Sequence, residues 1–174
     1  CANYPIVFYR NTLLKEMTMS IKISQNFDAG AIEVISTLNV ENIELNLRND
    51  SNADFTQWFY FRLQGARDQD ATMRILNAGD ATYPDGWMNY RAVASYDREN
   101  WFRVETEFDG KVMTIKHTPE TDSVYYAYFE PYSWERHLAL LGSVAQSEQV
   151  RVEDLGSTVD GRDLNVVVVG NPSA

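Results

Sequence analysis

The sequence contains very little cysteine and histidine, and it lacks any long hydrophobic run. Its one cysteine, Cys1, is the first of 174 residues, so no disulfide can form within the chain and no cysteine-based metal site can be built. No stretch of about 18 apolar residues is present, which excludes a transmembrane helix and argues against a membrane partner. The formal net charge is −10 and no cluster of Lys and Arg occurs, which argues against nucleic acid as a partner.

The first residues also lack the features of a secretion signal. Residues 1–16 have neither a basic start nor an uninterrupted apolar stretch of the required length. We expect them to be a leader or other upstream sequence. A chain without disulfides fits best in a reducing compartment, so the expected location is cytoplasmic.

Apolar and aromatic residues, by contrast, are abundant. Hydrophobic residues make up 44% and aromatic residues 13% of the chain, enough for the core of one domain with a piece of another. Residues 57–62 and 124–129 are conspicuously aromatic. Because successive side chains of a strand point to opposite faces, Phe59 covers one side of the first segment, and Trp58 and Tyr60 cover the other. Such a strand is expected in a sheet that is packed on both sides, or that packs against a core on one side and against a second domain on the other.

Short alternating segments separated by turn residues predict an antiparallel β-sandwich. The expected strands are residues 21–27, 31–40, 43–48, 57–63, 71–77, 87–95, 101–108, 111–117 and 124–129. Asp109-Gly110 lies between two of them. This dipeptide favours the positive backbone angles of a tight turn, so it predicts a hairpin.

The hydrophobic period changes from two to about 3.6 after Pro131, and Ser133 is a suitable N-cap for a helix. The apolar stripe of this expected helix consists of Trp134, Leu138, Leu141 and Ala145. His137 borders the stripe. We therefore expect His137 to pack or cap locally, with a contact to substrate or to a peptidase domain as the alternative.

Two more strands are expected at residues 149–159 and 163–170, on either side of the turn dipeptide Asp160-Gly161. Residues 166–169 are four successive valines. A strand without a polar face is typical of one that is buried on both sides in an α/β sheet. Because this strand lacks neighbours in the chain, its exposed edge also favours a homo-oligomer.

The order of these segments resembles the N-terminal β-domain of the cytosolic zinc carboxypeptidases, over about residues 19–174. The two aromatic segments and Ala-Thr-Tyr-Pro-Asp-Gly at 81–86 carry the likeness, and residues 158–170 resemble the opening hairpin of the catalytic α/β domain. The resemblance implies a mainly β fold. An antiparallel β-sandwich domain is expected at 17–132, and one helix and a β-hairpin that begin the catalytic domain are expected at 133–174.

The resemblance implies that the parent protein is a zinc metallopeptidase, a hydrolase that removes C-terminal residues from peptides or proteins. In that family a His-x-x-Glu zinc motif follows the valine strand, and a further zinc-binding His and a catalytic Glu come much later. None of those segments is found in this sequence. We therefore expect zinc in the parent enzyme, no catalytic residue, metal ligand or cofactor in this chain, and no peptidase activity of the chain alone.

The resemblance also implies that the β-domain packs on the catalytic domain and limits access of peptide or protein C-termini to the active site. The expected domain-interface or substrate-access residues are Tyr83, Asp85, Trp87, Pro131, Tyr132 and Trp134. Pro131 and Tyr132 lie where sheet changes to helix. The orientation of the two domains would be fixed there.

One short segment imitates the zinc motif, since His117-Thr-Pro-Glu120 has the spacing His-x-x-Glu. A zinc peptidase needs three protein ligands that converge on one ion and leave a position open for water. The one other histidine, His137, lies in the expected helix. His117 shares a strand face with Met113 and Ile115, so we expect a structural histidine.

Two other kinds of site are weaker. Glu105 and Glu107 share a strand face and could suggest paired catalytic carboxylates, but their alternation with apolar residues predicts a solvated face. The alternative function is a free-standing carbohydrate- or peptide-binding β-sandwich. Its aromatic platform would consist of Tyr83, Trp87, Tyr90 and Tyr96. Such modules need neither the helix nor the valine strand, which favours the carboxypeptidase interpretation.

Overall fold

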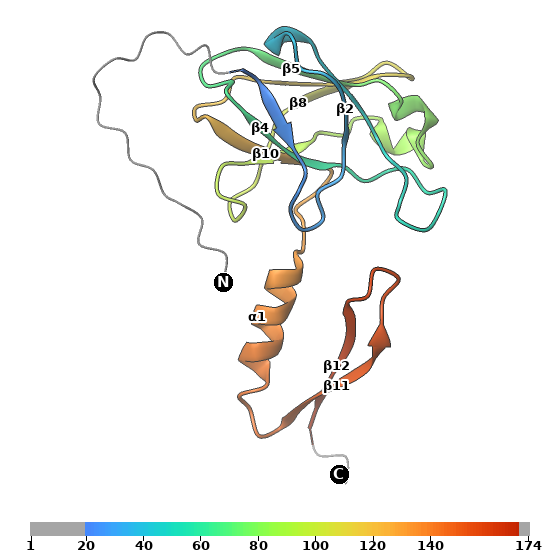
Figure 1. Ribbon diagram of the computed structural model, residues 1–174, viewed down its shortest axis with the longest axis vertical. Coiled ribbons are helices and arrows are strands. Elements are labelled where there is room, and N and C mark those ends of the chain that lie inside the picture. Colours follow the sequence, from blue (N-terminus) through green and yellow to red (C-terminus); the bar gives the residue numbers. More distant parts are fainter. Residues whose placement is uncertain (1–19, 171–174) are drawn as a thin grey trace, which may run out of the picture.

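The computed structural model describes residues 20–170, so the expected leader at 1–16 lies outside the described residues. Two five-stranded sheets form a β-sandwich, and a helix and a separate two-stranded hairpin follow it. Figure 1 shows the helix and hairpin extending from one side of the sandwich. The mainly β fold expected from the sequence is confirmed.

We name the two sheets of the sandwich A and B. Sheet A contains, in spatial order, β1 (Lys22–Ser24), β4 (Tyr60–Gln64), β10 (Ser123–Ala127), β6 (Val93–Ser95) and β7 (Phe102–Arg103). Sheet B contains β2 (Glu33–Ser36), β3 (Ile43–Asn46), β5 (Ala71–Ile75), β9 (Met113–His117) and β8 (Glu105–Phe108). Three short 3-10 turns are η1 (Val40–Asn42), η2 (Ala78–Asp80) and η3 (Pro84–Trp87). Sheet A lies on the side from which the helix and hairpin extend (Figure 1).

The sandwich departs from the expected pattern in three places. β3 and β5 pair in parallel, because the intervening β4 belongs to the other sheet, so the sandwich is not wholly antiparallel. The expected strand at 87–95 is shorter, since Trp87 belongs to η3. The expected strand at 101–108 divides at Val104, which is buried, and its halves β7 and β8 belong to different sheets. Period-two alternation continues across such a crossing, so the sequence pattern does not reveal it.

The hairpin predicted at Asp109-Gly110 is confirmed, with Phe108 of β8 opposite Met113 of β9. Gly110 has φ of 94°, a value that favours glycine. The carboxylate of Asp109 accepts the backbone N–H groups of Lys111 and Val112 at 2.8 and 2.7 Å. The turn therefore satisfies its own backbone donors.

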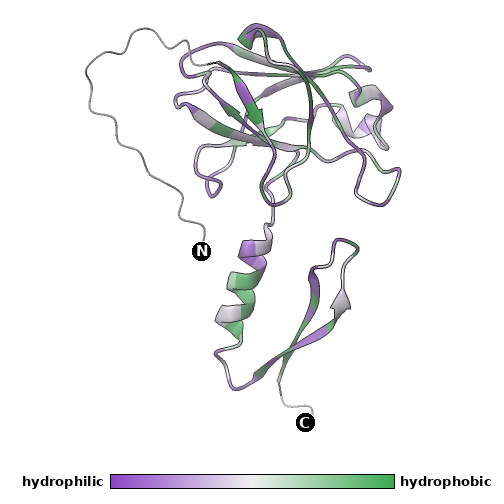
Figure 2. Cartoon of the chain, in the orientation of Figure 1, coloured by the Kyte–Doolittle hydropathy of each residue, from purple (hydrophilic) through white to green (hydrophobic). Residues whose placement is uncertain are grey.

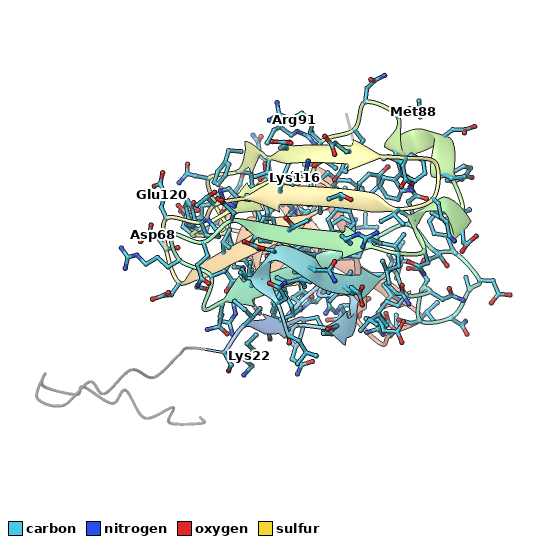
Figure 3. All side chains as sticks on the ribbon, turned by 90° about the horizontal axis from the view of Figure 1, so that it is seen from above. Lys22, Asp68, Met88, Arg91, Lys116 and Glu120 are labelled. Atoms are coloured by element: carbon cyan, nitrogen blue, oxygen red, sulfur yellow. The ribbon has the colours of Figure 1, made fainter. Side chains whose placement is uncertain are left out.

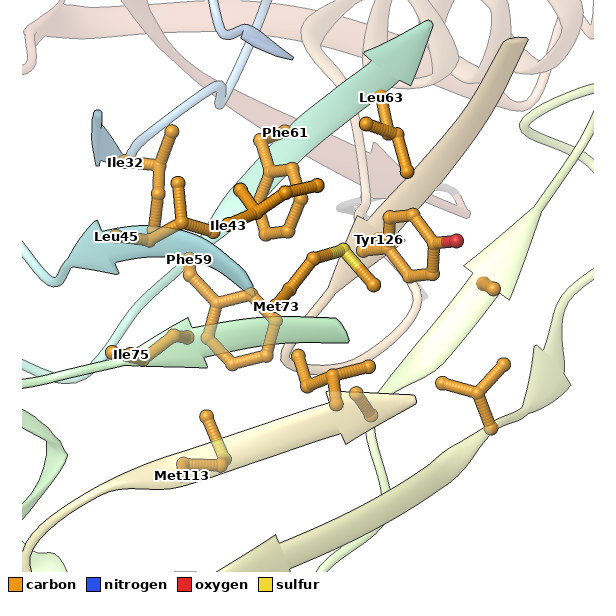
Figure 4. Close-up of a cluster of buried hydrophobic side chains, with 14 of the residues drawn as sticks. Ile32, Ile43, Leu45, Phe59, Phe61, Leu63, Met73, Ile75, Met113 and Tyr126 are labelled. Carbon is orange, nitrogen blue, oxygen red and sulfur yellow. The ribbon is translucent and has the colours of Figure 1, made fainter. Parts of the chain in front are cut away.

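Apolar side chains from both sheets fill the space between them (Figure 4). Phe59 and Phe61 point into this core from sheet A, and Met73 meets them from sheet B. The rings of Phe61 and Tyr126 stack with centroids 5.5 Å apart. Close packing of such large side chains is the main source of stability in a domain of this size.

The opposite face of sheet A is aromatic as well. Tyr60, Val93 and Ala127 are buried there, beneath Phe27, Trp58, Trp101 and Tyr125. We call these seven residues the outer aromatic face. The prediction that the strand at 57–63 is packed on both sides is thus confirmed.

The predicted helix and hairpin are both present. Helix α1 runs from Trp134 to Val144, and the side chain of Ser133 accepts the backbone N–H of Arg136, as expected for its N-cap. Strands β11 (Val150–Ser157) and β12 (Asp163–Val169) pair antiparallel. None of α1, β11 and β12 contains a buried residue, and Figure 2 shows apolar residues on the turns of α1.

Candidate interdomain surface

The sandwich meets the helix and hairpin at one carboxylate. Asp28, in the loop between β1 and β2, accepts the backbone N–H of Trp134 at 2.7 Å through its Oδ2 atom. Its Oδ1 atom lies 2.5 Å from an Nη atom of Arg162, in the turn between β11 and β12. The contact with Arg162 is one of charge, because Oδ1 has no aligned hydrogen bond. One side chain therefore contacts both elements that follow the sandwich.

The linker between sandwich and helix combines buried and exposed residues. Pro131 and Ser133 are buried, whereas Tyr132 between them is 57% exposed. The guanidinium of Arg136 lies 5.3 Å from the centre of the Tyr132 ring and forms an ion pair with Glu130 at 2.7 Å. The Tyr132 ring is therefore held in place and still presents surface to a partner.

Trp134 organises the contact between α1 and β12. Its indole lies 5.0 Å from the His137 ring and 5.5 Å from the guanidinium of Arg162. His137 Nε2 is 3.0 Å from Asn165 Oδ1. These side chains border an open cleft of about 240 Å³ between helix and strand. His137 therefore packs locally, as its place beside the helix stripe predicts.

The other group of expected interface residues lies on η3. The buried side chain of Gln57 holds this turn by accepting the N–H of Tyr83 at 2.9 Å and donating to its carbonyl at 3.3 Å. Tyr83 is 64% exposed and Asp85 is exposed too. Trp87 is only 1% exposed, and its Nε1 donates to the carbonyl of Ala78. Its indole fills the sandwich core, so Trp87 supports the turn from inside and presents no surface of its own.

The structure does not join the two groups of expected residues. Within residues 20–170, no hydrogen bond or ring contact links Tyr83 or Asp85 to the linker residues Pro131 and Tyr132. Tyr83 instead meets Phe55, with ring centroids 5.8 Å apart. The residues on η3 and the residues of the linker therefore belong to two separate surfaces.

Arg98 is a further exposed residue on the side of the outer aromatic face. Its guanidinium lies 6.0 Å from the centre of the Phe27 ring and 5.7 Å from that of Tyr125. Arg98 has φ of 68°, and the Asp97 carboxylate beside it accepts the N–H groups of Glu99 and Asn100. The side chain of Asn100 also donates a hydrogen bond to this carboxylate. That bond has the largest effect, and together with the backbone bonds it holds the pKa of Asp97 far below its usual range. The loop is therefore fixed and presents Arg98 over aromatic rings.

Three residues of these surfaces carry no signal in the sequence: Asp28, Arg98 and Arg162. Asp28 and Arg162 lie in turn-forming segments, where an acidic or basic residue is ordinary. Their pairing depends on folding that joins residues more than a hundred positions apart. A carboxylate that caps a distant helix leaves no local pattern.

His117 has a structural environment. Its Nδ1 is 2.8 Å from the hydroxyl of Tyr126, and burial lowers the pKa of its imidazole. Within residues 20–170 no group of three His, Cys, Asp or Glu side chains is placed to hold a metal ion. His117 and Glu120 therefore lack the further ligands that a zinc ion needs.

The structure favours neither a pair of catalytic carboxylates nor a sugar-binding platform. Glu105 and Glu107 both form ion pairs with Lys116, at 3.4 and 3.1 Å. Figure 3 shows Lys116 on the outside of sheet B. The expected sugar platform is not formed, because Trp87 is buried and packs edge-on against Tyr90.

Over the described range, no helix is long and apolar enough to cross a membrane.

Comparison with known proteins defines the class of this fold. Residues 23–129 match the cytosolic carboxypeptidase N-terminal domain. A metallo-carboxypeptidase from Burkholderia cenocepacia is 56% identical, with a TM-score of 0.86 over 88% of this chain and 40% of that chain. A metallo-carboxypeptidase from Pseudomonas aeruginosa is 38% identical, with a TM-score of 0.80 over 88% of this chain and 41% of that chain. Cytosolic carboxypeptidase 2 of Mus musculus is 27% identical over 94% of this chain and 21% of its own length.

The chain therefore belongs to the cytosolic carboxypeptidase N-terminal domain family. It spans about two fifths of the length of the bacterial structures that it matches, and about one fifth of the mouse relative. The likeness to the solved structures covers a larger share of the chain than the family match does.

Proposed function

We propose that this chain is the accessory N-terminal β-domain, with the first elements of the catalytic domain, of a cytoplasmic zinc metallocarboxypeptidase that removes C-terminal residues from peptides or proteins. In this proposal residues 17–132 form the accessory domain and residues 133–174 begin the catalytic domain. The zinc ligands and catalytic Glu belong to other segments of the parent. The family match and the likeness to metallo-carboxypeptidase structures support this proposal.

The observation that carries the proposal is the open apolar surface of the helix and hairpin. Leu138 and Leu140 on α1 are exposed, and Val169 on β12 is 72% exposed. A two-stranded hairpin has little stability of its own, and its free edges offer hydrogen bonds to further strands. The remaining sheet of a catalytic domain would supply that pairing and cover the apolar residues.

The same arrangement gives the accessory domain a place to act on substrate access. Tyr132 lies at the joint, and Trp134 is the first residue of the helix that begins the proposed catalytic domain. Tyr83 and Asp85 form a second exposed surface on a rigid turn. We propose that the catalytic domain contacts these two surfaces, and that the sandwich narrows the approach to the active site.

The test uses the parent enzyme with its catalytic domain. We expect Tyr132→Ala to lower its stability and to change the ratio of kcat/KM for a folded protein C-terminus to kcat/KM for a blocked dipeptide. Loss of one aromatic contact of about 0.5–1 kcal/mol corresponds to a change of about two- to fivefold. Glu107→Gln, on the far sheet, is the matched control.

Two results would contradict the proposal. One is a Tyr132→Ala enzyme with unchanged stability and an unchanged substrate ratio, because the contact would then be absent. The other is peptidase activity with stoichiometric zinc in the 174-residue chain alone, because this chain offers no fitting ligand set among its described residues.

A further inference from the structure

We propose that Asp28 is the positioning residue that fixes the orientation of the sandwich relative to the helix and hairpin, as a helix cap from a distance and as the ion-pair partner of Arg162. This inference rests on the proposed function in one respect: the helix and hairpin are taken as the start of the catalytic domain. The orientation of the sandwich would then decide how it stands over the active site.

The N-terminus of α1 is capped partly by the sandwich. The first backbone N–H groups of a helix have no partner inside the helix, and they favour a negative charge. Ser133 satisfies the N–H of Arg136. The N–H of Trp134, the first residue of the helix, is satisfied by Asp28, which is 106 residues earlier in the chain. The sandwich therefore supplies part of the cap of the helix that follows it.

Arg162 links the hairpin to the same carboxylate. The side chain of Asp28 is 17% exposed and that of Arg162 is 46% exposed, so their charge contact is shielded from water mainly on the Asp28 side. The guanidinium of Arg162 also packs near the indole of Trp134, at 5.5 Å. Asp28, Trp134 and Arg162 thus form a closed group of three contacts from three elements. None of the three elements can rotate without breaking one of these contacts.

The loop that carries Asp28 is tightly closed. Phe27 donates its N–H to the carbonyl of Gln25, and Gly30 donates to the carbonyl of Phe27. Ala29 has φ of 59°, an uncommon conformation for a residue with a side chain. A Cβ atom on Gly30 would lie 1.9 Å from the Gln25 carbonyl oxygen. The loop therefore holds the Asp28 carboxylate in position before the contact forms.

Other polar contacts across the joint are scarce. Between residues 20–127 and 133–170, three side-chain hydrogen bonds and ion pairs are present, and two of them are made by Asp28. The third joins Ser51 to Asp160 at 3.4 Å and is exposed. A long, solvated hydrogen bond contributes little to orientation. The polar restraint on orientation therefore depends on Asp28.

The test measures the distance between sandwich and helix in the whole 174-residue chain. Spin labels are placed on Glu41→Cys and Gln146→Cys, both exposed positions, in a Cys1→Ser background. We expect one narrow peak in the pulsed-EPR distance distribution and loss of that peak in Asp28→Ala. Asp28→Asn keeps an acceptor for the Trp134 N–H but loses the charge, so it should give an intermediate width.

The control is Glu107→Gln, which removes an ion pair with Lys116 on sheet B and should leave the peak narrow. Thermal unfolding of each variant shows whether the sandwich remains folded. If Asp28→Ala does not fold, Asp28→Asn and Arg162→Lys carry the test, and both should broaden the peak.

A narrow peak in Asp28→Ala, or equal broadening in Glu107→Gln, would overturn the proposal. An Asp28→Asn distribution as wide as that of Asp28→Ala would overturn the capping part. The measurement needs no peptidase activity. Failure of the Asp28 proposal would leave the carboxypeptidase proposal untouched, and failure of the carboxypeptidase proposal would not alter the measured distances.

Discussion

The hydrogen bond between Tyr126 and His117 gives a prediction that separates a structural histidine from a zinc ligand. Tyr126 lies on β10 of sheet A and His117 on β9 of sheet B, so the bond joins the two sheets. Tyr126 is fully buried, and burial raises the pKa of its phenol, so the hydroxyl stays protonated and donates to His117 Nδ1. Within the described chain this nitrogen is the one acceptor within hydrogen-bond distance of that hydroxyl.

Tyr126→Phe removes the donor and leaves the ring in the core. The lost hydrogen bond and the unsatisfied His117 nitrogen should lower the free energy of unfolding by about 1–2 kcal/mol. For a chain of this size the melting temperature should fall by about 2–4 °C for each kcal/mol. Urea unfolding followed by tryptophan fluorescence measures the loss. Tyr125→Phe is the matched control, because Tyr125 lies on the other face of the same strand and its hydroxyl has no hydrogen bond in residues 20–170.

The pH dependence follows from the same site. Desolvation lowers the pKa of His117 from its ordinary value of 6.5, and the Glu120 carboxylate opposes this shift only in part. The unfolded chain therefore binds the imidazole proton at higher pH than the folded chain does. Above pH 6.5 the imidazole is neutral in both states and causes no loss of stability. As the pH falls from there through the depressed folded pKa, the unfolded chain takes up the proton first and the free energy of unfolding decreases. We expect His117→Gln to reduce the loss of stability between about pH 7.5 and pH 5.5.

Several results would refute this reasoning. Tyr126→Phe with the stability of the unchanged chain would show that the bond contributes nothing. Stability that rises on acidification, in a His117-dependent way, would give the shift the wrong sign. A melting temperature that falls with a chelator and recovers with zinc, but shows neither effect in His117→Gln, would identify His117 as a metal ligand.

Three further predictions concern the loop, the core and the free strand. Gly30→Ala should cost about 1–3 kcal/mol or more in urea unfolding, because its Cβ would overlap the Gln25 carbonyl oxygen; unchanged stability would contradict the loop geometry. Trp87→Ala should cost about 3–5 kcal/mol, and a small loss would show that the site is not tightly packed. The chain should self-associate with concentration in light scattering, and Val167→Lys on β12 should reduce this; a monomer throughout would contradict pairing through that edge.

Local patterns are sufficient to predict most elements of the fold. Ser133 caps α1 because its hydroxyl reaches a backbone N–H three residues away. Asp109-Gly110 forms its hairpin because Gly110 adopts the positive φ that the turn requires. Both depend on neighbours in the sequence. The aromatic alternation around Tyr60 also predicts two packed faces correctly, since a strand places neighbouring residues on opposite sides.

The features that the sequence pattern does not reveal depend on the path of the chain between sheets. Val104 continues the alternation of its neighbours, yet the chain passes there from sheet A to sheet B. β3 and β5 pair in parallel because β4 lies in the other sheet. Trp87 fits an interface by its position beside an exposed turn, but its indole points into the core. No period or spacing distinguishes these arrangements before the sheets are assembled.

The contacts made by Asp28 restrain only one side of the joint. The other side is a cleft of about 260 Å³, with Tyr60 and Trp101 on the sandwich and Arg136 on the helix. In the described range, no hydrogen bond or ion pair joins the loop at 97–101 to residues 131–136 across it. On the proposed function, we expect the catalytic domain to cover this cleft, where the guanidinium of Arg98 would attract a carboxylate.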